Sequence, residues 1–87
     1  LANRMIIIVA EGSGIATKAD LAGKKVAVQA GSSALDAINA EPEVAASFAE
    51  MPEYADNPSA FLDLKAGRVD ALVVDEVVGR NLIANMG

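Results

Sequence analysis

The sequence predicts an α/β domain of three layers, in which a mostly parallel sheet lies between helices. Short apolar runs rich in β-branched residues alternate with segments that carry helix-start residues such as Ser, Asp and Pro. The runs are apolar on both faces, as strands are when helices cover both sides of a sheet. We therefore expect parallel strands joined by right-handed crossovers. The 87 residues provide one core, so residues 1–87 are expected to form a single domain.

The first strand is expected at residues 5–10, a β-branched run that ends at Glu11-Gly12-Ser13-Gly14. Its continuous apolar character predicts burial on both faces, followed by a turn. A single helical turn is expected at residues 20–23, with Asp20 as an acidic cap and Gly23 as the stop.

A second buried strand is expected at residues 25–29. Gly31, Ser32 and Ser33 then provide a break and a cap for a helix that runs to about residue 39. Pro42 either ends this helix or starts another one over residues 42–48.

The second half of the chain continues the alternation. Residues 50–54 alternate polar and apolar, but Pro52 has no backbone N–H to donate, so we expect an edge strand at best. Asp56-Asn57-Pro58 predicts a helix start, and Gly67 its end. Residues 69–74 predict a buried strand, and Asp75 is expected to cap a last helix that runs toward residue 86.

The composition excludes several classes of function. Seven Lys and Arg against twelve Asp and Glu give a net charge of -5, which disfavours nucleic acid and anionic membranes as partners. Cys and His are absent, which removes disulfides, thiol nucleophiles, imidazole bases and zinc sites built on either residue. The longest apolar stretch has six residues, whereas a helix needs roughly 20 to span a bilayer.

Two further patterns are interpreted as structural. Gly12-Ser13-Gly14 could begin a phosphate-binding loop, but no Gly-Lys-Ser or Gly-Lys-Thr follows, and residue 17 is Thr where a dinucleotide-binding motif has Gly. Asp70, Asp75 and Glu76 could suggest a site for a hard cation, but Asp70 and Asp75 lie at opposite ends of one predicted strand. We expect neither a metal nor another cofactor.

The candidate site residues lie where two predicted strands end. In open α/β sheets, ligands bind beyond the carboxyl ends of the strands. Gln29, Gly31, Ser32 and Ser33 form one such end, with hydroxyls and free backbone N–H groups that suit a carboxylate or phosphate oxygen. Asp75 forms the other, where its carboxylate could hold an ammonium. On residue type alone, ordinary helix capping is the simpler explanation for the Ser residues, and for Asp75 capping and ligand binding explain the pattern equally well.

Taken together, the two ends have complementary chemistry. A donor-rich helix start and an acceptor carboxylate that face one cleft would match a zwitterion, with its anion on the N–H groups and its cation on Asp75. An α-amino acid is the simplest molecule of this kind.

Four segments, in this order, carry a family resemblance: residues 20–33 (DLAGKKVAVQAGSS), Asn57-Pro58, residues 64–71 (LKAGRVDA) and Val74-Asp75-Glu76. They resemble the second lobe of the extracellular solute-binding proteins of family 3, the polar amino-acid-binding components of ABC importers. Several motifs in the right order are more specific than any one of them alone. The resemblance covers nearly all 87 residues.

The resemblance implies a single lobe of a type II periplasmic-binding-protein-like fold, from a protein whose two lobes close on an amino acid. It implies that Ser33 and the backbone of Gly31–Ser33 meet the ligand carboxylate, that Asp75 meets the ammonium, and that Gln29 lies near the ligand side chain. The first lobe and the hinge strands are expected to lie outside residues 1–87. Because a lone lobe leaves its site open to water, we expect the chain alone to bind amino acids weakly or not at all.

The main hypothesis is therefore a binding lobe, not an enzyme, that serves amino-acid delivery to an ABC importer. Two alternatives share the fold: a lobe of a cyclohexadienyl or arogenate dehydratase, with Asp75 and Glu76 as the available acids, and a lobe of a ligand-sensing receptor. A small interaction domain without a ligand is the remaining interpretation.

The resemblance also implies the partners and the location. The partners are a small amino acid, the missing first lobe and the membrane subunits of the importer. The location is periplasmic or extracellular, with a membrane tether in a Gram-positive cell. An exposed apolar strand edge could also pair with a second copy of the chain, which would give a homodimer.

Overall fold

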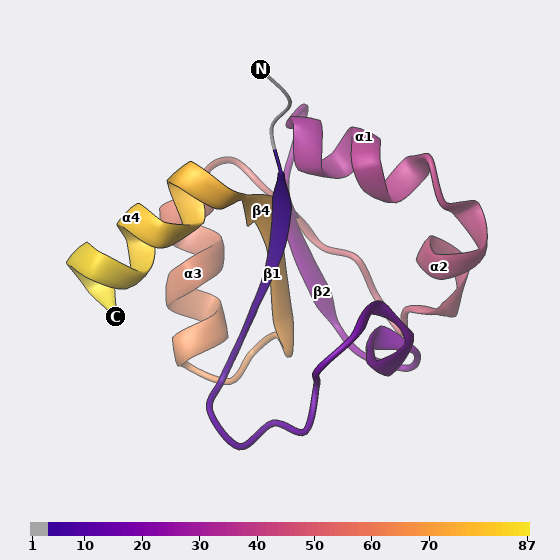
Figure 1. Ribbon diagram of the computed structural model, residues 1–87, viewed down its shortest axis with the longest axis horizontal. Coiled ribbons are helices and arrows are strands. Elements are labelled where there is room, and N and C mark those ends of the chain that lie inside the picture. Colours follow the sequence, from indigo (N-terminus) through magenta and orange to yellow (C-terminus); the bar gives the residue numbers. More distant parts are fainter. Residues whose placement is uncertain (1–3) are drawn as a thin grey trace.

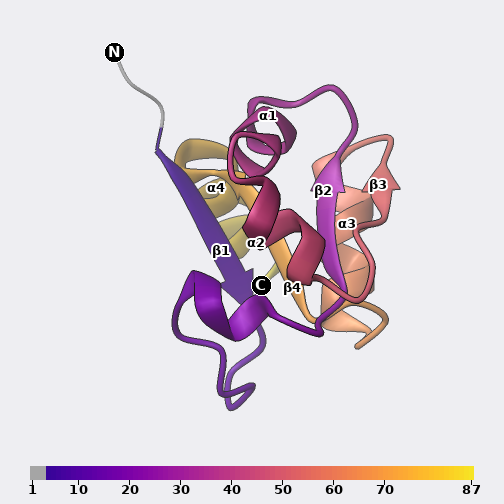
Figure 2. The same ribbon diagram turned by 90° about the vertical axis from the view of Figure 1, so that its right-hand side faces the viewer.

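The computed structural model describes residues 4–87, which form a four-stranded sheet with helices packed on both faces (Figure 1). Helices α1 and α2 cover one face, and α3 and α4 cover the other (Figures 1 and 2). The predicted three-layer α/β architecture is confirmed. The elements are β1 (Met5–Val9), the 3₁₀ helix η1 (Lys18–Leu21), β2 (Val26–Gln29), α1 (Ser33–Asn39), α2 (Pro42–Ser47), β3 (Glu53–Tyr54), α3 (Asn57–Lys65), β4 (Ala71–Asp75) and α4 (Glu76–Met86).

The strand order in the sheet is β1-β4-β2-β3. Strands β3 and β4 both run parallel to β2, whereas β1 runs antiparallel to β4. The prediction of a mostly parallel sheet is therefore correct. The two central strands carry the most deeply buried residues, and Val26, Ala27, Ala71 and Leu72 have no exposed surface at all.

The prediction for the first strand is wrong in its burial. Strand β1 lies at the edge of the sheet, and only Ile8 in it is buried, while its other residues are half-buried. Ile6 and Ile8 pack toward α3 and α4, and Met5, Ile7 and Val9 pack toward α1 and α2. Because helices cover both faces of the sheet, an edge strand is apolar on both faces too, and its sequence looks like that of a central strand.

The helical turn lies earlier in the chain than predicted. Helix η1 begins at Lys18, so Asp20 lies inside it and does not precede it. The Asp20 carboxylate accepts hydrogen bonds from the N–H groups of Ala16 and Thr17 at 2.9 and 3.0 Å. These backbone bonds hold the pKa of Asp20 below its ordinary value. Asp20 thus holds the backbone of Ala16 and Thr17 just before η1. Gly23, with φ of 74°, follows the helix end as predicted.

Capping signals located the remaining helices well. Ser32 accepts a hydrogen bond from the Leu35 N–H at 3.1 Å and caps α1. Pro42 starts α2, which decides between the two alternatives. Strand β3 has two residues, and an isolated bridge between Lys25 and Glu50 extends its pairing with β2, as expected for an edge strand that contains Pro52.

Two apolar clusters, one on each face, hold the layers together. Phe61 and Leu64 attach α3 to the sheet, and Ile38 does the same for α1 on the opposite face. No helix in residues 4–87 has the length and apolar character needed to cross a bilayer. Burial of these clusters supplies the main driving force for folding.

Helix α4 approaches β1 and β4 closely at Gly79. A Cβ atom at this position would lie 2.8 Å from Ile6 Cδ1 and 2.9 Å from Val74 Cγ1. The backbone of Gly79 is helical and has no positive φ, so its conformation does not require glycine. The close packing of α4 against Ile6 and Val74 is what requires it.

Candidate ligand-binding site

Three helices begin at the same edge of the sheet. Because β2, β3 and β4 run parallel, their carboxyl ends meet at one edge, and α1, α3 and α4 follow directly. We call this edge the rim and define it as residues 29–33, 54–57 and 75–77. The starts of α1 and α4 lie at this edge on opposite sides of the sheet (Figure 1). Helix starts offer backbone N–H groups that have no intrahelical acceptor, so the rim is suited to anionic groups.

Asp75 ends β4 and caps α4. Its Oδ1 accepts hydrogen bonds from the N–H groups of Val77 and Val78 at 2.9 and 3.2 Å, so the capping role that the sequence allowed is present. Its Oδ2 has no hydrogen-bond donor within residues 4–87. Asp75 shares the side-chain alternation of Ala71 and Val73, which pack on the α1 face of the sheet. The carboxylate therefore leaves the sheet on the same face as α1.

The turn between β2 and α1 holds the predicted carboxylate-binding residues. Gly31 has a φ of 67°, which glycine adopts without strain. The Ser32 N–H and hydroxyl both donate to the Gln29 carbonyl, at 3.3 and 2.7 Å, and the same hydroxyl accepts from Leu35. Ser32 is thus occupied in shaping the turn. Ser33 is exposed at the first position of α1, where its N–H and hydroxyl have no acceptor in the described part of the chain.

Gln29 lies on the other face of the sheet. It shares the alternation of Ala27, which packs toward α3. Its Oε1 accepts a hydrogen bond from the Asn57 N–H at 2.9 Å, so Gln29 ties the end of β2 to the start of α3. The carbonyl half of this side chain is committed to the fold, and only its NH₂ group remains for other contacts.

The register of β2 and β4 brings the turn and Asp75 together. Val26 lies beside Ala71 and Ala27 beside Leu72. The same offset sets Ala30 level with Asp75, on strands that are about 4.8 Å apart. The turn that leads to Ser33 and the Asp75 carboxylate therefore leave the sheet next to each other, on one face. Among the predicted site residues, these two groups are brought together and Gln29 is directed away from them.

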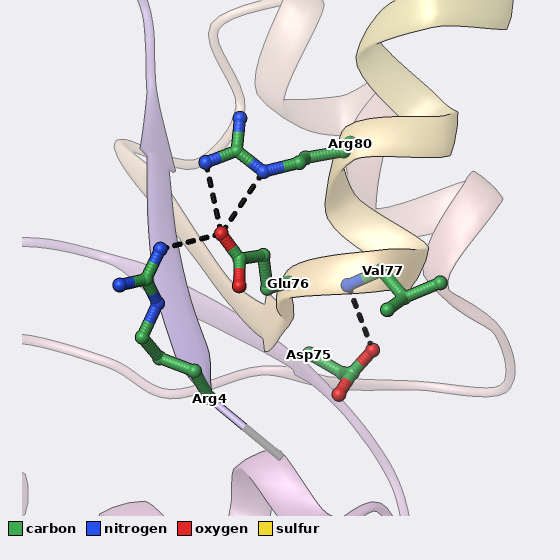
Figure 3. Close-up of polar contacts among 5 residues, drawn as sticks. All are labelled: Arg4, Asp75, Glu76, Val77 and Arg80. Atoms are coloured by element: carbon green, nitrogen blue, oxygen red, sulfur yellow. Dashed lines mark hydrogen bonds and ion pairs between the residues drawn. The ribbon is translucent and has the colours of Figure 1, made fainter.

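A charged cluster next to Asp75 was missed by the sequence reasoning. Glu76 accepts from Arg4 at 2.5 Å and forms an ion pair with Arg80 at 2.8 Å, as Figure 3 shows. Hydrogen bonds from the two guanidinium groups hold the pKa of Glu76 below its ordinary value. In the same view the Asp75 carboxylate binds Val77 and takes no part in the cluster. The four-residue spacing of Glu76 and Arg80 could have indicated one pair, whereas Arg4 depends on the β1–β4 register.

The rim is separate from a pocket of about 300 Å³ on the α1 and α2 face. That pocket is lined mainly by apolar side chains, and the Lys18–Glu41 ion pair, at 2.8 Å, lies at it. None of the predicted site residues contributes to its wall. Within residues 4–87 no group of acidic residues is arranged to hold a metal ion.

No protein-family model matches the chain, and no curated protein sequence matches it either. Solved structures do match. A substrate-binding protein of an ABC uptake transporter from Streptococcus pneumoniae, solved with bound histidine, is 35% identical with a TM-score of 0.85, over 94% of this chain and 35% of that one. An ancestral arginine-binding protein bound to arginine is 32% identical with a TM-score of 0.82, over 97% of this chain and 37% of that one. The ancestral protein was also solved bound to glutamine.

The decisive match is to one domain of such a protein. Domain 2 of TmArgBP is 33% identical to this chain with a TM-score of 0.73, and the match covers 93% of this chain and 85% of that domain. The chain belongs to the amino-acid-binding proteins of ABC transporters. It is a second lobe in that family, as the sequence resemblance implied, and the lobe spans about a third of the length of the two larger relatives. The matched proteins are substrate-binding proteins, in line with the expectation of a binding lobe.

Proposed function

We propose that this lobe holds one side of an amino acid at the rim, as half of a bilobed protein that delivers the amino acid to an ABC importer. The exposed N–H and hydroxyl of Ser33, with the N–H of Gly31, bind the carboxylate. The free Oδ2 of Asp75 binds the ammonium. The observation that carries the proposal is that the turn before Ser33 and the Asp75 carboxylate leave the sheet side by side on one face.

The hydrogen bonds of Ser32 and Gln29 within the fold give these two residues supporting roles in the proposed site. Ser32 shapes the turn, because its hydroxyl and N–H are bonded to Gln29 and Leu35. Gln29 positions α3 through Asn57, and its NH₂ group is the part that can reach a ligand side chain. Ser33, Gly31 and Asp75 therefore make the charged contacts, and Ser32 and Gln29 hold their surroundings.

The proposed partners lie outside this chain, because the chain spans only about a third of the length of its relatives. We propose that residues 1–87 form one domain, and that a first lobe outside them covers the rim when ligand is bound. Closure would exclude water and strengthen the charged contacts, each worth about 1.5–3 kcal/mol when desolvated. Binding proteins of ABC uptake systems are typically extracytoplasmic. A periplasmic or extracellular location and contact with the importer membrane subunits are parts of the proposal.

A matched pair of substitutions in the bilobed protein tests the site. Asp75 and Asp56 are both helix caps at the rim, on α4 and α3. Asp75→Asn and Asp56→Asn each remove one negative charge and keep a good capping residue. Titration calorimetry with arginine, histidine and glutamine should show that Asp75→Asn weakens binding at least tenfold and that Asp56→Asn changes it less than twofold.

Ligand analogues give a second, independent arm. An N-acetylated amino acid lacks the ammonium, and an amino-acid amide lacks the carboxylate, so both should bind far more weakly than the free amino acid. If the wild type binds N-acetylated and free amino acids equally, or if the two Asn variants behave alike, Asp75 does not receive the ammonium.

A further inference from the structure

Two guanidinium groups lie next to the proposed ammonium site without contacting it. Arg4 directly precedes β1, whose first pair joins Met5 to Asp75, and Arg80 lies on α4 about one turn after Glu76. Figure 3 shows both guanidinium groups turned toward Glu76 and away from the Asp75 carboxylate. Carboxylates are preferred partners of arginine side chains. Within residues 4–87, the Oδ2 atom of Asp75 nevertheless has no donor, although two suitable donors are nearby.

Glu76 holds both guanidinium groups with one oxygen. Its Oε2 lies 2.5 Å from Arg4 Nη2 and 2.8 Å from Arg80 Nη2, and Arg80 Nε donates to the same oxygen at 3.0 Å. The Glu76 N–H donates to the Arg4 carbonyl at 2.8 Å, so backbone and side chain are fixed together. The side chain of Glu76 is 25% exposed, whereas those of Arg4 and Arg80 are 70% and 67% exposed. Within residues 4–87, Glu76 is the acidic partner of both arginines.

Asp75 is the adjacent carboxylate that the two arginines would meet if Glu76 did not hold them. Its Cα atom is about 3.8 Å from that of Glu76, and its carboxylate caps the same helix start. A guanidinium group tethered there has an effective concentration of about the millimolar range, and it would compete with a ligand ammonium for Oδ2. Positive charges within the Debye length of about 8 Å also oppose the binding of another cation.

We propose that Glu76 is a positioning residue for the ammonium site, because it holds Arg4 and Arg80 and so keeps their guanidinium groups from occupying Asp75. The inference rests on the proposed function, in which Asp75 Oδ2 receives the ligand ammonium. Glu76 touches no ligand atom and acts through Asp75. Its pKa lies below the ordinary value, so Glu76 is ionised and holds both arginines at neutral pH.

A double-mutant cycle on the unfolding of the 87-residue chain tests the competition without a ligand. The cycle combines Asp75→Asn with the joint change Arg4→Gln and Arg80→Gln, and it is measured with Glu76 present and with Glu76→Gln. With Glu76 present, the coupling should change the unfolding equilibrium constant less than about 1.5-fold. With Glu76→Gln, a released guanidinium group pairs with Asp75, and the coupling should reach at least about threefold. Equal coupling in both backgrounds would overturn the proposal.

Ligand affinity in the bilobed protein supplies the second arm. Titration calorimetry uses the tightest binder among arginine, histidine and glutamine as the probe. Glu76→Gln should weaken binding at least about fivefold, and the further changes Arg4→Gln and Arg80→Gln should restore it to within about twofold of the wild type. Glu41→Gln removes the acid of the Lys18 ion pair and should change binding less than about 1.5-fold.

The rescue separates positioning from ordinary stabilisation by ion pairs. If the cluster only stabilises the fold, the variant that lacks all three charges binds no better than Glu76→Gln, and that result would contradict the proposal. Unchanged binding by Glu76→Gln would do the same. Asp75→Asn in the same series distinguishes the two levels of inference. If Asp75→Asn leaves binding unchanged, the proposed function fails, whereas weakened binding by Asp75→Asn without the rescue means that only the role of Glu76 is wrong.

Discussion

Within residues 4–87, one carboxylate oxygen of Asp75 caps α4 and the other has no hydrogen-bond donor, and two substitutions can separate these two features. Oδ1 caps α4 through Val77 and Val78. Asp75→Ala removes the cap and should lower the free energy of unfolding of the 87-residue chain by about 1 kcal/mol. Asp75→Asn keeps a capping oxygen and should change it by a few tenths of a kcal/mol. Urea unfolding of both variants measures the difference, and equal losses would mean that the charge, not the cap, stabilises α4.

Glu76 should contribute to the pH dependence of stability. Its pKa is lowered in the folded chain by the hydrogen bonds from Arg4 and Arg80, so its contribution is present above its ordinary pKa of 4.5 and is lost as the pH falls through the lower folded value. Glu76→Gln should therefore destabilise the chain at neutral pH, with a deficit that shrinks below pH 4.5.

Urea unfolding of the wild type and Glu76→Gln across this pH range checks the prediction. Lys18 and Glu41 form an ion pair elsewhere, so Glu41→Gln serves as the control for general loss of a surface acid. A deficit for Glu76→Gln that grows on acidification would contradict the assigned direction of the shift.

The position of helix α4 depends on a single small residue, Gly79. Gly79→Ala gains helix propensity but places a methyl group 2.8 Å from Ile6 Cδ1 and 2.9 Å from Val74 Cγ1. Overpacking of this kind costs about 1–3 kcal/mol, and Val74 is stiff, so we expect a net loss of stability. Ile6→Val removes the nearer atom and should recover part of the loss in the double mutant. A thermal unfolding cycle over the four proteins measures this coupling.

The elements that the sequence predicted well have local signals. Ser32, Asp56 and Asp75 each bond to an N–H two or three residues ahead, so a short stretch of sequence contains the whole contact. The direction and edge position of β1 have no such signal. The five apolar residues of β1 have the same pattern in either orientation. Only pairing with β4, which lies far along the chain, decides the direction and the edge position of β1.

The difference between local contacts and long-range pairing also decides which parts of the site could be predicted. The positions of Ser33 and Asp75 at strand ends could be predicted, because strand and helix boundaries are local features. The commitment of Gln29 to Asn57 and the cluster of Arg4 with Glu76 could not, because both depend on which strands lie side by side. Side-chain alternation along β2 does explain the direction of Gln29 once the two faces of the sheet are known.

As a whole, the molecule presents one wall of the proposed binding site. The rim is open in the described chain, so water screens both Ser33 and Asp75. We expect the 87-residue chain to bind arginine, histidine or glutamine with a dissociation constant far above about 1 μM, or not measurably. NMR titration is suited to this range. A dissociation constant at or below about 1 μM would show that the second wall is not required.

Strand β1 brings the start of the described chain back to the rim. Its first pair, Met5 with Asp75, lies at the same edge as Ser33, while its last pair, Val9 with Ala71, lies at the far edge. Strands at the boundary of a sheet fray from their ends at little free-energy cost. Tension on the chain ahead of Arg4 would therefore separate β1 from β4 beginning at Asp75, the residue that caps α4. The proposed ammonium contact of Asp75 would then weaken before the buried layers are disturbed.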